Sequence, residues 1–414
     1  MREKNTVCRA ASTVCFETIE AHARAHIQQW LQHLLEAEVT EFLGRAKSQR
    51  RAAPQRCGYR NGYGRPRRLA LSSGTITLRR PRMRNLARRF ESRVLPLFRR
   101  RSAELGALLP QLYLHGLSSG DFELALRGLL GEGAPLSAAS LARLKGVWQT
   151  EYETWKRTDL SALELVYWWA DGLYVKAGIA DRRAALLVIV GATAQGNKVL
   201  LACQAGERES AQAWAAVLRD LRARGLAFPR LTVADGNLGI WAALGELHPA
   251  GDEQRCWNHK ILNVLDALPK KAQAEARERL RAMMYAESRS ACERARDAFL
   301  LRYRKTDPRA CATLTRDWAR LVAFFDYPRE HWIHLRTTNI VESPFDPVRL
   351  RTNAARRFKK TENAEAMIWK LLRVAEQSWR ALNAPHRMRE VYNGTRFKDG
   401  IAIASANEPT RKAA

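Results

Sequence analysis

Residues 165–176 read LVYWWADGLYVK, an apolar and aromatic run that predicts a buried strand and contains one carboxylate, Asp171. An unpaired buried carboxylate is costly, so a strand that carries one pairs it, ends at it or uses it to bind a metal ion. On its own, the following Gly172 favours a strand end or a turn. Residues 231–237 read LTVADGN and bring a second aspartate, Asp235, to the end of another β-branched run. The repeated pattern indicates a shared site.

The segment between the two aspartates begins with a predicted hairpin. Residues 184–194 and 198–205 are two apolar runs, and Gln195, Gly196 and Asn197 between them are typical of a hairpin loop. A pair of strands therefore follows the strand that carries the first aspartate.

A helix is predicted next. In residues 209–224 the apolar side chains fall on one helical face, and Gly225 follows as a C-cap residue. The order is then a strand with Asp171, a hairpin pair, a helix, a strand with Asp235 and a further helix. This is the order of a ribonuclease-H-like α/β core, in which the first and fourth strands lie side by side and bring their acids together.

The charge balance predicts a polyanionic partner. The chain of 414 residues has 70 Lys and Arg against 42 Asp and Glu, a net charge of +28, and its length suggests two or three domains. Nucleic acid is the first candidate. A membrane surface is the other polyanion, but no apolar run has the length of a spanning helix and residues 1–12 lack a signal-peptide core. We therefore expect no membrane partner.

Two segments of different character begin the chain. Residues 1–44 carry apolar residues at helical spacing and are expected to pack or dimerise. Residues 45–101 contain 18 Arg and one Lys against a single acid, and a small hairpin is expected within 69–78. A charge run is usually a solvated face, but arginine forks grip phosphate at two points and tyrosines between them can stack on bases. We therefore interpret this segment as DNA-binding.

Residues 102–160 are expected to be helical. Their helical patterns cover 103–115, 121–130 and 137–155. A short helix, a turn and a longer helix fit a helix-turn-helix, and an ordinary helical bundle fits equally well. The basic segment before them favours DNA binding.

The core is expected over residues 161–382, with a helical interruption. A run from about 260 to 330 is rich in Ala, Arg and Glu and shows no strand pattern, so we interpret it as an all-α insertion. A further acid, Glu342, lies beyond this run. Residues 383–414 are polar and are expected to form a loosely ordered tail.

From about residue 60 to residue 382 the chain resembles a Mutator-type transposase of bacterial insertion sequences. That family has two Asp and one Glu in a ribonuclease-H-like core with a helical insertion, and the expected fold is this core preceded by the mainly helical, basic DNA-binding region described above. The motifs that carry the resemblance are DGLYVK at 171–176, VADG at 233–236, QRCWNHKILNVL at 254–265, TTNIVE at 337–342, and the less specific RNGY at 60–63 and PR at 81–82.

The resemblance implies that Asp171, Asp235 and Glu342 are the catalytic metal ligands. The expected cofactor is two Mg²⁺ or Mn²⁺ ions. Two divalent ions about 4 Å apart can activate a water or a 3′-hydroxyl and stabilise the leaving oxygen, and Mg²⁺ prefers oxygen ligands. Asp171, on the central strand, is our choice for the ligand that bridges both ions.

Cys256 and His259 resemble the Cys-x-x-His signature of the family. Two ligands do not make a zinc site and no Cys-x-x-Cys pair is present, so no zinc is expected. The signature is expected to pack the insertion against the core or to place His259 near the scissile phosphate. Trp257 beside it could stack on a flipped base, but a core aromatic residue is our preferred interpretation.

The placement of Glu342 is less regular, because Pro344 and Pro347 follow it. Proline fits only the first turn of a helix, so Glu342 is expected at or just before a helix N-terminus. Glu362 and Glu365 on the following helix are alternative acids. Further DNA-contacting or core-supporting candidates are Arg60, Tyr63, Arg82, Arg349 and Arg351.

The predicted function is that of a DNA transposase. It would bind the terminal inverted repeats of its element, cut at the element ends and join the 3′ ends to target DNA, as a homo-oligomer that handles two ends together. The alternative is a decayed or domesticated copy that binds DNA as a repressor. A generic RNA-binding protein would not explain two strands that end in matched aspartates.

The cysteines indicate where the protein resides. The chain has 7 of them, an odd and scattered set that favours free thiols in a reducing compartment. We therefore expect a bacterial cytoplasmic protein that associates with the nucleoid through DNA.

Overall fold

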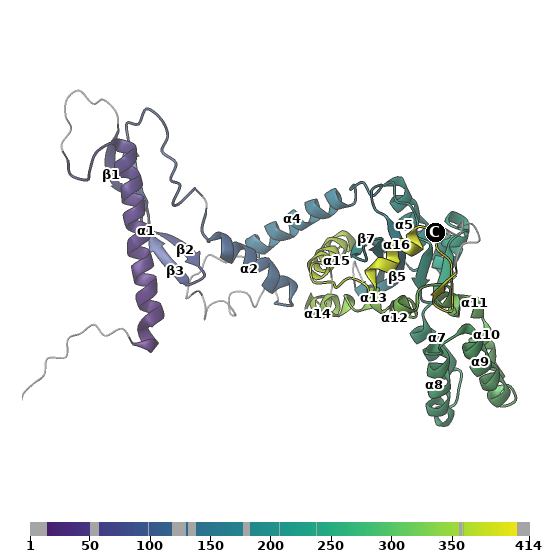
Figure 1. The fold of residues 1–414 in the computed structure, drawn as a ribbon. Helices are drawn as coiled ribbons and strands as arrows, with labels where there is room; N and C mark the ends of the chain where they lie inside the picture. Colours follow the sequence, from purple (N-terminus) through teal and green to yellow (C-terminus); the bar gives the residue numbers. More distant parts are fainter. Residues whose placement is uncertain are drawn as a thin grey trace, which may run out of the picture. The chain divides into compact units, whose positions relative to one another are not determined.

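The computed structural model divides into two compact units, Met1–Leu144 and Lys145–Ala414, and each is described by itself (Figure 1). It describes residues 15–49, 58–97, 99–117, 130, 138–176, 183–206, 208–236, 238–355, 358 and 360–403. Most of the helix predicted at 121–130 and the last residues of the tail lie outside these ranges. None of the helices within them combines the length and hydropathy that crossing a membrane requires.

The first unit consists of one long helix and two short antiparallel sheets. The turn η1 (Phe16–Thr18) leads into α1 (Ile19–Leu43). Strands β2 (Arg67–Leu71) and β3 (Gly74–Leu78) form the hairpin that the sequence predicts. Strands β1 (Tyr59–Tyr63) and β4 (Pro81–Arg84) form the second pair. The helix α2 (Ala103–Leu114) follows them.

Helix α1 packs on the hairpin through an apolar face and two glutamines. Leu35 of α1 is buried with Ile76 and Leu78 of the hairpin in one hydrophobic cluster. Gln28 Oε1 accepts a hydrogen bond from the Thr77 backbone N–H at 3.0 Å. Gln32 accepts from Arg79 N–H at 3.0 Å and donates to the Arg79 carbonyl at 2.9 Å. The glutamine amides therefore pair with the edge of β3 as a neighbouring strand would. The segment was expected to pack or to dimerise, and the contacts of α1 show packing.

The second unit is built on a five-stranded mixed sheet in the order β7-β6-β5-β8-β9. The strands are β5 (Leu165–Lys176), β6 (Arg183–Thr193), β7 (Lys198–Gly206), β8 (Leu231–Ala234) and β9 (Asp252–Arg255). Strands β5, β6 and β7 are antiparallel, whereas β8 is parallel to both β5 and β9. The first and fourth strands are therefore neighbours, which confirms the strand order predicted for a ribonuclease-H-like core.

Side-chain alternation gives β5 two different faces. Trp168 and Ala170 join the cluster that packs under α5 (Ala211–Ala223) and α6 (Leu238–Leu247). Tyr167 and Trp169 face the other way: the Tyr167 hydroxyl lies 2.9 Å from His331 Nδ1, and Trp169 Nε1 donates to the His334 carbonyl at 3.0 Å. Asp171 shares their parity, so it projects toward the face that the segment around residues 329–342 covers.

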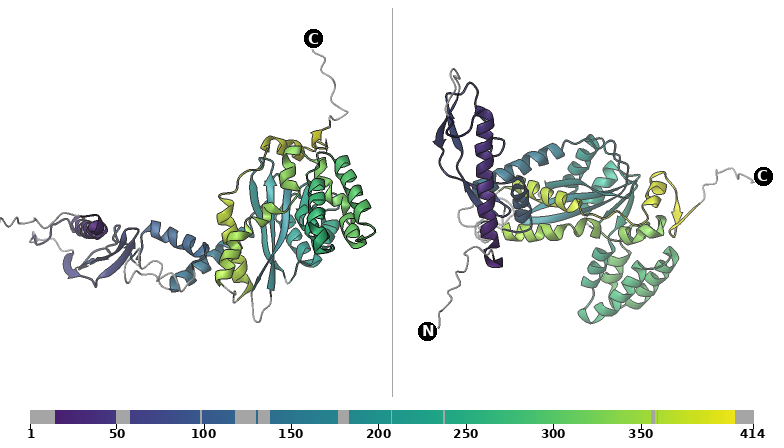
Figure 2. Two further views of the ribbon diagram at one scale, coloured as in Figure 1. Left: turned by 90° about the horizontal axis from the view of Figure 1, so that it is seen from below. Right: turned by 60° about the vertical axis from the view of Figure 1, so that its left-hand side comes forward.

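A group of helices follows β9 and contains most of the predicted insertion (Figures 1 and 2). Its α8 packs along α9, and its α7 packs on α10. Lys260 of α7 is buried and donates to the carbonyls of Thr313 and Arg316, both at 2.6 Å, which ties α7 to the end of α10. The bounds are α7 (Trp257–Asp266), α8 (Lys270–Met284), α9 (Arg289–Tyr303), α10 (Pro308–Thr315), α11 (Trp318–Leu321) and α12 (Trp332–Leu335).

The remaining helices return to the sheet. Helix α15 (Thr361–Glu376) runs along the edge strand β7, where Glu365 accepts from Ala205 N–H at 2.5 Å and Glu376 accepts from Leu200 N–H at 2.9 Å. The other helices are α4 (Ala138–Trp155), α13 (Asn339–Glu342), α14 (Phe345–Ala355) and α16 (Pro385–Tyr392).

The expectation of a loosely ordered tail over 383–414 is wrong for its first part. Residues 385–392 form α16, and β10 (Phe397–Lys398) pairs with β11 (Ile401–Ala402). Asp399 Oδ1 accepts from Arg289 N–H at 2.6 Å, and Gly400 N–H donates to the Phe325 carbonyl at 3.1 Å. These long-range contacts, which a polar composition does not reveal, anchor the segment.

Two glycines of α6 provide a matched test of this packing. A Cβ on Gly239 would lie 2.4 Å from the backbone oxygen of Glu209, whereas nothing lies within 4 Å of a Cβ on Gly245. We expect Gly239→Ala to lower the free energy of unfolding by about 1–3 kcal/mol through overpacking. Gly245→Ala should raise it by about 0.5–1 kcal/mol through helix propensity. Urea denaturation of both variants measures the difference, and equal effects would contradict the close approach.

Candidate active site

The register of two parallel strands brings the predicted aspartates together. Ala170 of β5 pairs with Ala234 of β8. The residues that follow them, Asp171 and Asp235, therefore lie side by side. Strand β5 continues through Asp171, which lies opposite Val188 of β6. Asp235 directly follows β8, and its backbone carbonyl accepts from Trp241 Nε1 at 3.1 Å. Asp171-Gly172 is therefore part of a strand, and the turn that this dipeptide favours on its own is not formed.

Glu342 approaches the Asp171 carboxylate from helix α13. It is the last residue of α13, which contacts β5. Burial, together with the negative charges of Glu342 and Asp235, raises the pKa of Asp171 to about 7, against a hydrogen bond from Gly172 N–H and the charge of His259. The three predicted acids thus act on one another. Glu342 ends a one-turn helix before α14, in keeping with the prolines that follow it.

The alternative acids lie elsewhere. The Glu365 carboxylate accepts from the backbone of β7, and β6 separates that strand from β5. Glu362 is exposed in the first turn of α15. Neither residue is among the charges that act on Asp171.

The glycine after each aspartate makes room for a charged side chain. A Cβ on Gly172 would lie 2.2 Å from Oε1 of Glu209, and a Cβ on Gly236 would lie 2.0 Å from Nη2 of Arg255. Arg255 is nearly buried and pairs with Asp317 at 2.6 Å. Neither Glu209 nor Arg255 was predicted as a site residue. The repeated Asp-Gly was the signal, because a missing Cβ beside a functional residue allows such an approach.

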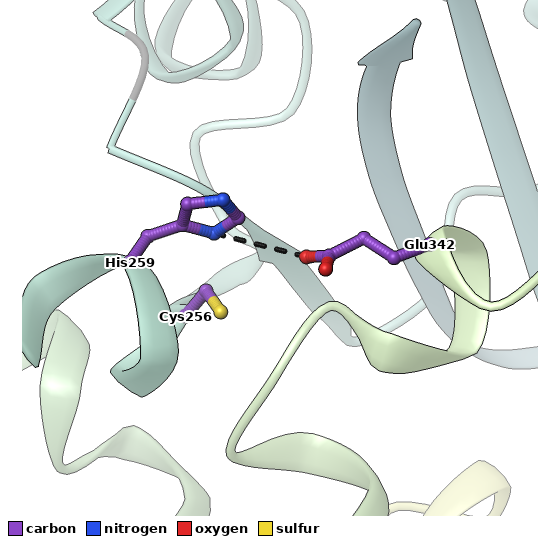
Figure 3. Close-up of side chains that lie close together, drawn as sticks. All are labelled: Cys256, His259 and Glu342. Atoms are coloured by element: carbon purple, nitrogen blue, oxygen red, sulfur yellow. Dashed lines mark ion pairs between the residues drawn. The ribbon is translucent and has the colours of Figure 1, made fainter. Parts of the chain in front are cut away.

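Cys256 and His259 lie beside Glu342 (Figure 3). Cys256 caps α7 and His259 lies in its first turn, so both side chains project toward α13. His259 Nδ1 is 3.8 Å from Glu342 Oε1. The Cys256 side chain, followed by Glu342 and Asp235, raises the pKa of His259 to about 9 against the effect of burial.

Thr338 connects the cysteine to the glutamate. Its backbone N–H donates to Cys256 Sγ at 3.4 Å, and its hydroxyl lies 3.2 Å from the same sulfur. The hydroxyl also donates to Glu342 Oε1. Thr338 and Cys256 are both fully buried. Thr338 lies within the TTNIVE motif, but its role could not be predicted because its contacts depend on the approach of two distant segments.

The remaining candidates fall in different environments. Trp257 is fully buried and donates to the Leu321 carbonyl at 2.8 Å, a core position that prevents stacking on a base. Arg351 is 2% exposed and also lies in the core. Arg349 is exposed beside Asp346 at 3.2 Å.

In the first unit, Arg82 of β4 is exposed and Tyr63 of β1 is 40% exposed. The Tyr63 hydroxyl accepts from Lys47 Nζ at 3.2 Å. Arg60 instead turns toward α1, where it donates to the Thr40 hydroxyl at 2.7 Å and pairs with Glu36 at 3.5 Å. The first two side chains are therefore accessible to a partner, whereas Arg60 supports the fold of the unit.

The chain is similar in sequence to transposases of bacterial insertion sequences. The transposase of insertion sequence element IS6120 of Mycolicibacterium smegmatis is 45% identical over 74% of this chain and 95% of its own length. The transposase of IST2 of Acidithiobacillus ferrooxidans is 42% identical over 67% of this chain and 94% of its own length. The Drosophila P element transposase strand transfer complex matches 69% of this chain and 90% of its own, at 14% identity and a TM-score of 0.26, which is too low to support a conclusion.

The family model described as "Transposase, Mutator family" matches residues 2–381, nearly the whole chain. The two bacterial relatives are matched over almost their full length. The chain therefore belongs to the Mutator family of transposases.

Proposed function

We propose that this transposase cuts DNA at the ends of its insertion sequence and joins the freed 3′ ends to target DNA by metal-dependent phosphoryl transfer. The observation that carries the proposal is the placement of Asp171 beside Asp235 by two parallel strands, with the charge of Glu342 acting on the same carboxylate. The family assignment supports the reaction class.

The three acids fit divalent cations such as Mg²⁺ or Mn²⁺. Carboxylate oxygens are the ligands that these hard ions prefer. Burial and neighbouring negative charge disfavour the ionised form of Asp171, and a cation among the acids would offset that cost. When bound, two such ions supply an activated water or 3′-hydroxyl and stabilise the leaving oxygen.

The position of each acid suggests its role. Asp171 lies on a strand flanked on both sides, and the charges of both other acids act on it, so we assign it as the ligand common to both ions. Asp235 and Glu342 would each complete one ion site. Glu209 places a fourth carboxylate over Gly172, the residue next to Asp171. Arg255 brings a positive charge next to Gly236, the residue after Asp235, and pairs with Asp317.

We assign recognition of the terminal inverted repeats to residues 45–160. Residues 45–101 carry most of the excess positive charge of the chain, and phosphate contacts of this kind dominate affinity for DNA. Helices α7 to α10 would be the all-α insertion of the core. Because two element ends must be processed together, we expect a homo-oligomer, which would associate with the bacterial nucleoid through DNA.

Removal of any one acid should abolish cutting but spare DNA binding. For Asp171→Asn, Asp235→Asn and Glu342→Gln we expect cleavage to fall by more than about 10²-fold, because an ion site contributes several kcal/mol to the transition state. The measurement is strand cleavage of a labelled duplex carrying the terminal repeat, in Mg²⁺ or Mn²⁺ against EDTA, with filter binding on the same DNA.

The matched control for this experiment is Glu365→Gln, which keeps an acceptor for Ala205 N–H and should cut normally. Normal cutting by Glu342→Gln would show that the third ligand is misassigned. Tight binding of the repeat by the wild type without any cutting would favour a repressor.

Without divalent ions, Asp171→Asn should stabilise the fold at high pH. The pKa of Asp171 is raised from 3.8 to about 7, so the folded state binds this proton more tightly than the unfolded state. The ionised side chain therefore costs stability, and the cost grows from about pH 4 to pH 7 and then levels off. We expect a gain of up to about 4 kcal/mol at pH 8, at about 1.4 kcal/mol per unit of pKa, and no gain below pH 4.

Chemical denaturation in EDTA across this pH range measures the gain. The control is Asp346→Asn, since the Asp346 side chain is 79% exposed, and its effect should stay within about 0.5 kcal/mol. If the change in the free energy of unfolding caused by Asp171→Asn did not vary with pH, ionisation of Asp171 would not destabilise the fold.

A further inference from the structure

A second group of metal-ligand side chains lies beside the three acids and shares Glu342 with them. Cys256 Sγ, a ring nitrogen of His259 and a carboxylate oxygen of Glu342 lie within 4.8 Å of one another. Figure 3 shows the first two on α7 and the third on α13, all pointing toward a common centre. The part of the chain that the structure describes holds no other such group of three.

The two ligands on α7 are placed by helix geometry. Residues three apart in sequence lie on the same face of a helix, so a cysteine at the N-cap and a histidine three positions later project together. Asn339–Glu342 is a single helical turn whose N-cap is Thr338. Trp257 N–H donates to the Arg336 carbonyl at 2.9 Å, which holds this turn close to the start of α7.

The histidine has an unsatisfied nitrogen that faces the group. His259 Nδ1 is buried and has no hydrogen-bond partner among the described residues. Its 3.8 Å distance to Glu342 Oε1 is too long for a hydrogen bond. A buried polar atom without a partner costs about 1–3 kcal/mol, and coordination to a metal ion would remove that cost.

The cysteine and glutamate are already oriented by one residue. The Thr338 backbone N–H donates to Cys256 Sγ, and its hydroxyl contacts both Sγ and Glu342 Oε1. A hydroxyl has one hydrogen and the carboxylate can only accept, so the hydrogen goes to Glu342. Hydrogen bonds of this type from neighbouring groups hold and orient metal ligands.

We propose that Cys256, His259 and Glu342 form a site for a thiophilic divalent cation, Zn²⁺ or Cd²⁺, with a water in the fourth position. Thiolate, imidazole and carboxylate together suit Zn²⁺, whereas Mg²⁺ does not take sulfur. The expectation of no zinc counted only the two ligands on α7. The third comes from α13, which the sequence does not place beside them.

The shared glutamate gives the site a consequence for activity, which rests on the proposed function. A Glu342 carboxylate bound to Zn²⁺ beside Cys256 is withdrawn from Asp171 and Asp235. Thiophilic cations should therefore inhibit DNA cleavage in Mg²⁺ by occupying a site of their own, and removing the thiolate should relieve the inhibition.

Binding is tested first, without reference to activity, by titrating Co²⁺ into the metal-free full-length protein. We expect about one equivalent to bind with a sulfur-to-cobalt charge-transfer band, which Zn²⁺ then abolishes by displacement. Cys256→Ser, which is nearly isosteric, should lose the band. His259→Ala should weaken Co²⁺ binding by more than about 10-fold, because a three-ligand site loses one ligand.

Two control variants separate this site from other thiols and from the three acids, and a pair of variants at Thr338 tests the residue that orients the ligands. Cys311→Ser changes another mostly buried helical cysteine and should keep the band. Asp171→Asn should also keep it, so that the result stands even if the assignment of the three acids fails. Thr338→Ser should bind Co²⁺ like the wild type, and Thr338→Val should bind it about 10-fold more weakly or worse.

Inhibition is tested second, with each protein compared with its own zinc-free cleavage rate. The wild type should lose activity at Zn²⁺ concentrations that leave Cys256→Ser unaffected. Absence of the charge-transfer band, or a band that survives in Cys256→Ser, would overturn the site. Equal inhibition of both proteins would place the inhibitory Zn²⁺ among the three acids instead.

Discussion

The parallel pairing of β5 with β8 is the constraint on which the site depends. Their register places Ala170 opposite Ala234, and both aspartates follow from it. Because side chains alternate along a strand, a slip of one residue would move an aspartate to the opposite face and dissolve the pair. Such a slip is prevented by Trp168 and Trp169, both fully buried on opposite faces, with the Trp169 indole fixed to the His334 carbonyl. The aromatic residues of this strand therefore set the geometry of the acids.

The site brings several charged side chains close together in a partly buried position, which is usually unfavourable. Asp171 is partly buried close to two further acids, and glycines on both strands admit Glu209 and Arg255 at distances that a Cβ would forbid. Buried charges usually require partners. The packing of the aromatic core under β5, and of the helices that cover it, offsets the free-energy cost of this arrangement.

The spacing of apolar residues and the loop residues between the apolar runs allowed the sheet to be predicted from the sequence. Continuous apolar runs, the loop at Gln195 to Asn197 and two Asp-Gly endings led to the strand order that is observed. The contacts that depend on distant segments could not be predicted. Examples are Glu209 over Gly172, Thr338 between Cys256 and Glu342, and Asp399 on Arg289. Each joins residues far apart in sequence, and none leaves a local pattern beyond the absence of a side chain at a glycine.

The helices that run along sheet edges have a consequence for behaviour in solution. An open strand edge offers unpaired peptide groups to any other chain and invites sheet-to-sheet aggregation. Gln28 and Gln32 occupy such groups beside β3, and Glu365 and Glu376 occupy them on β7. Side chains on α1 and α15 thus replace the neighbouring strand that each sheet lacks. These two edges are thereby closed to pairing with a strand of another chain.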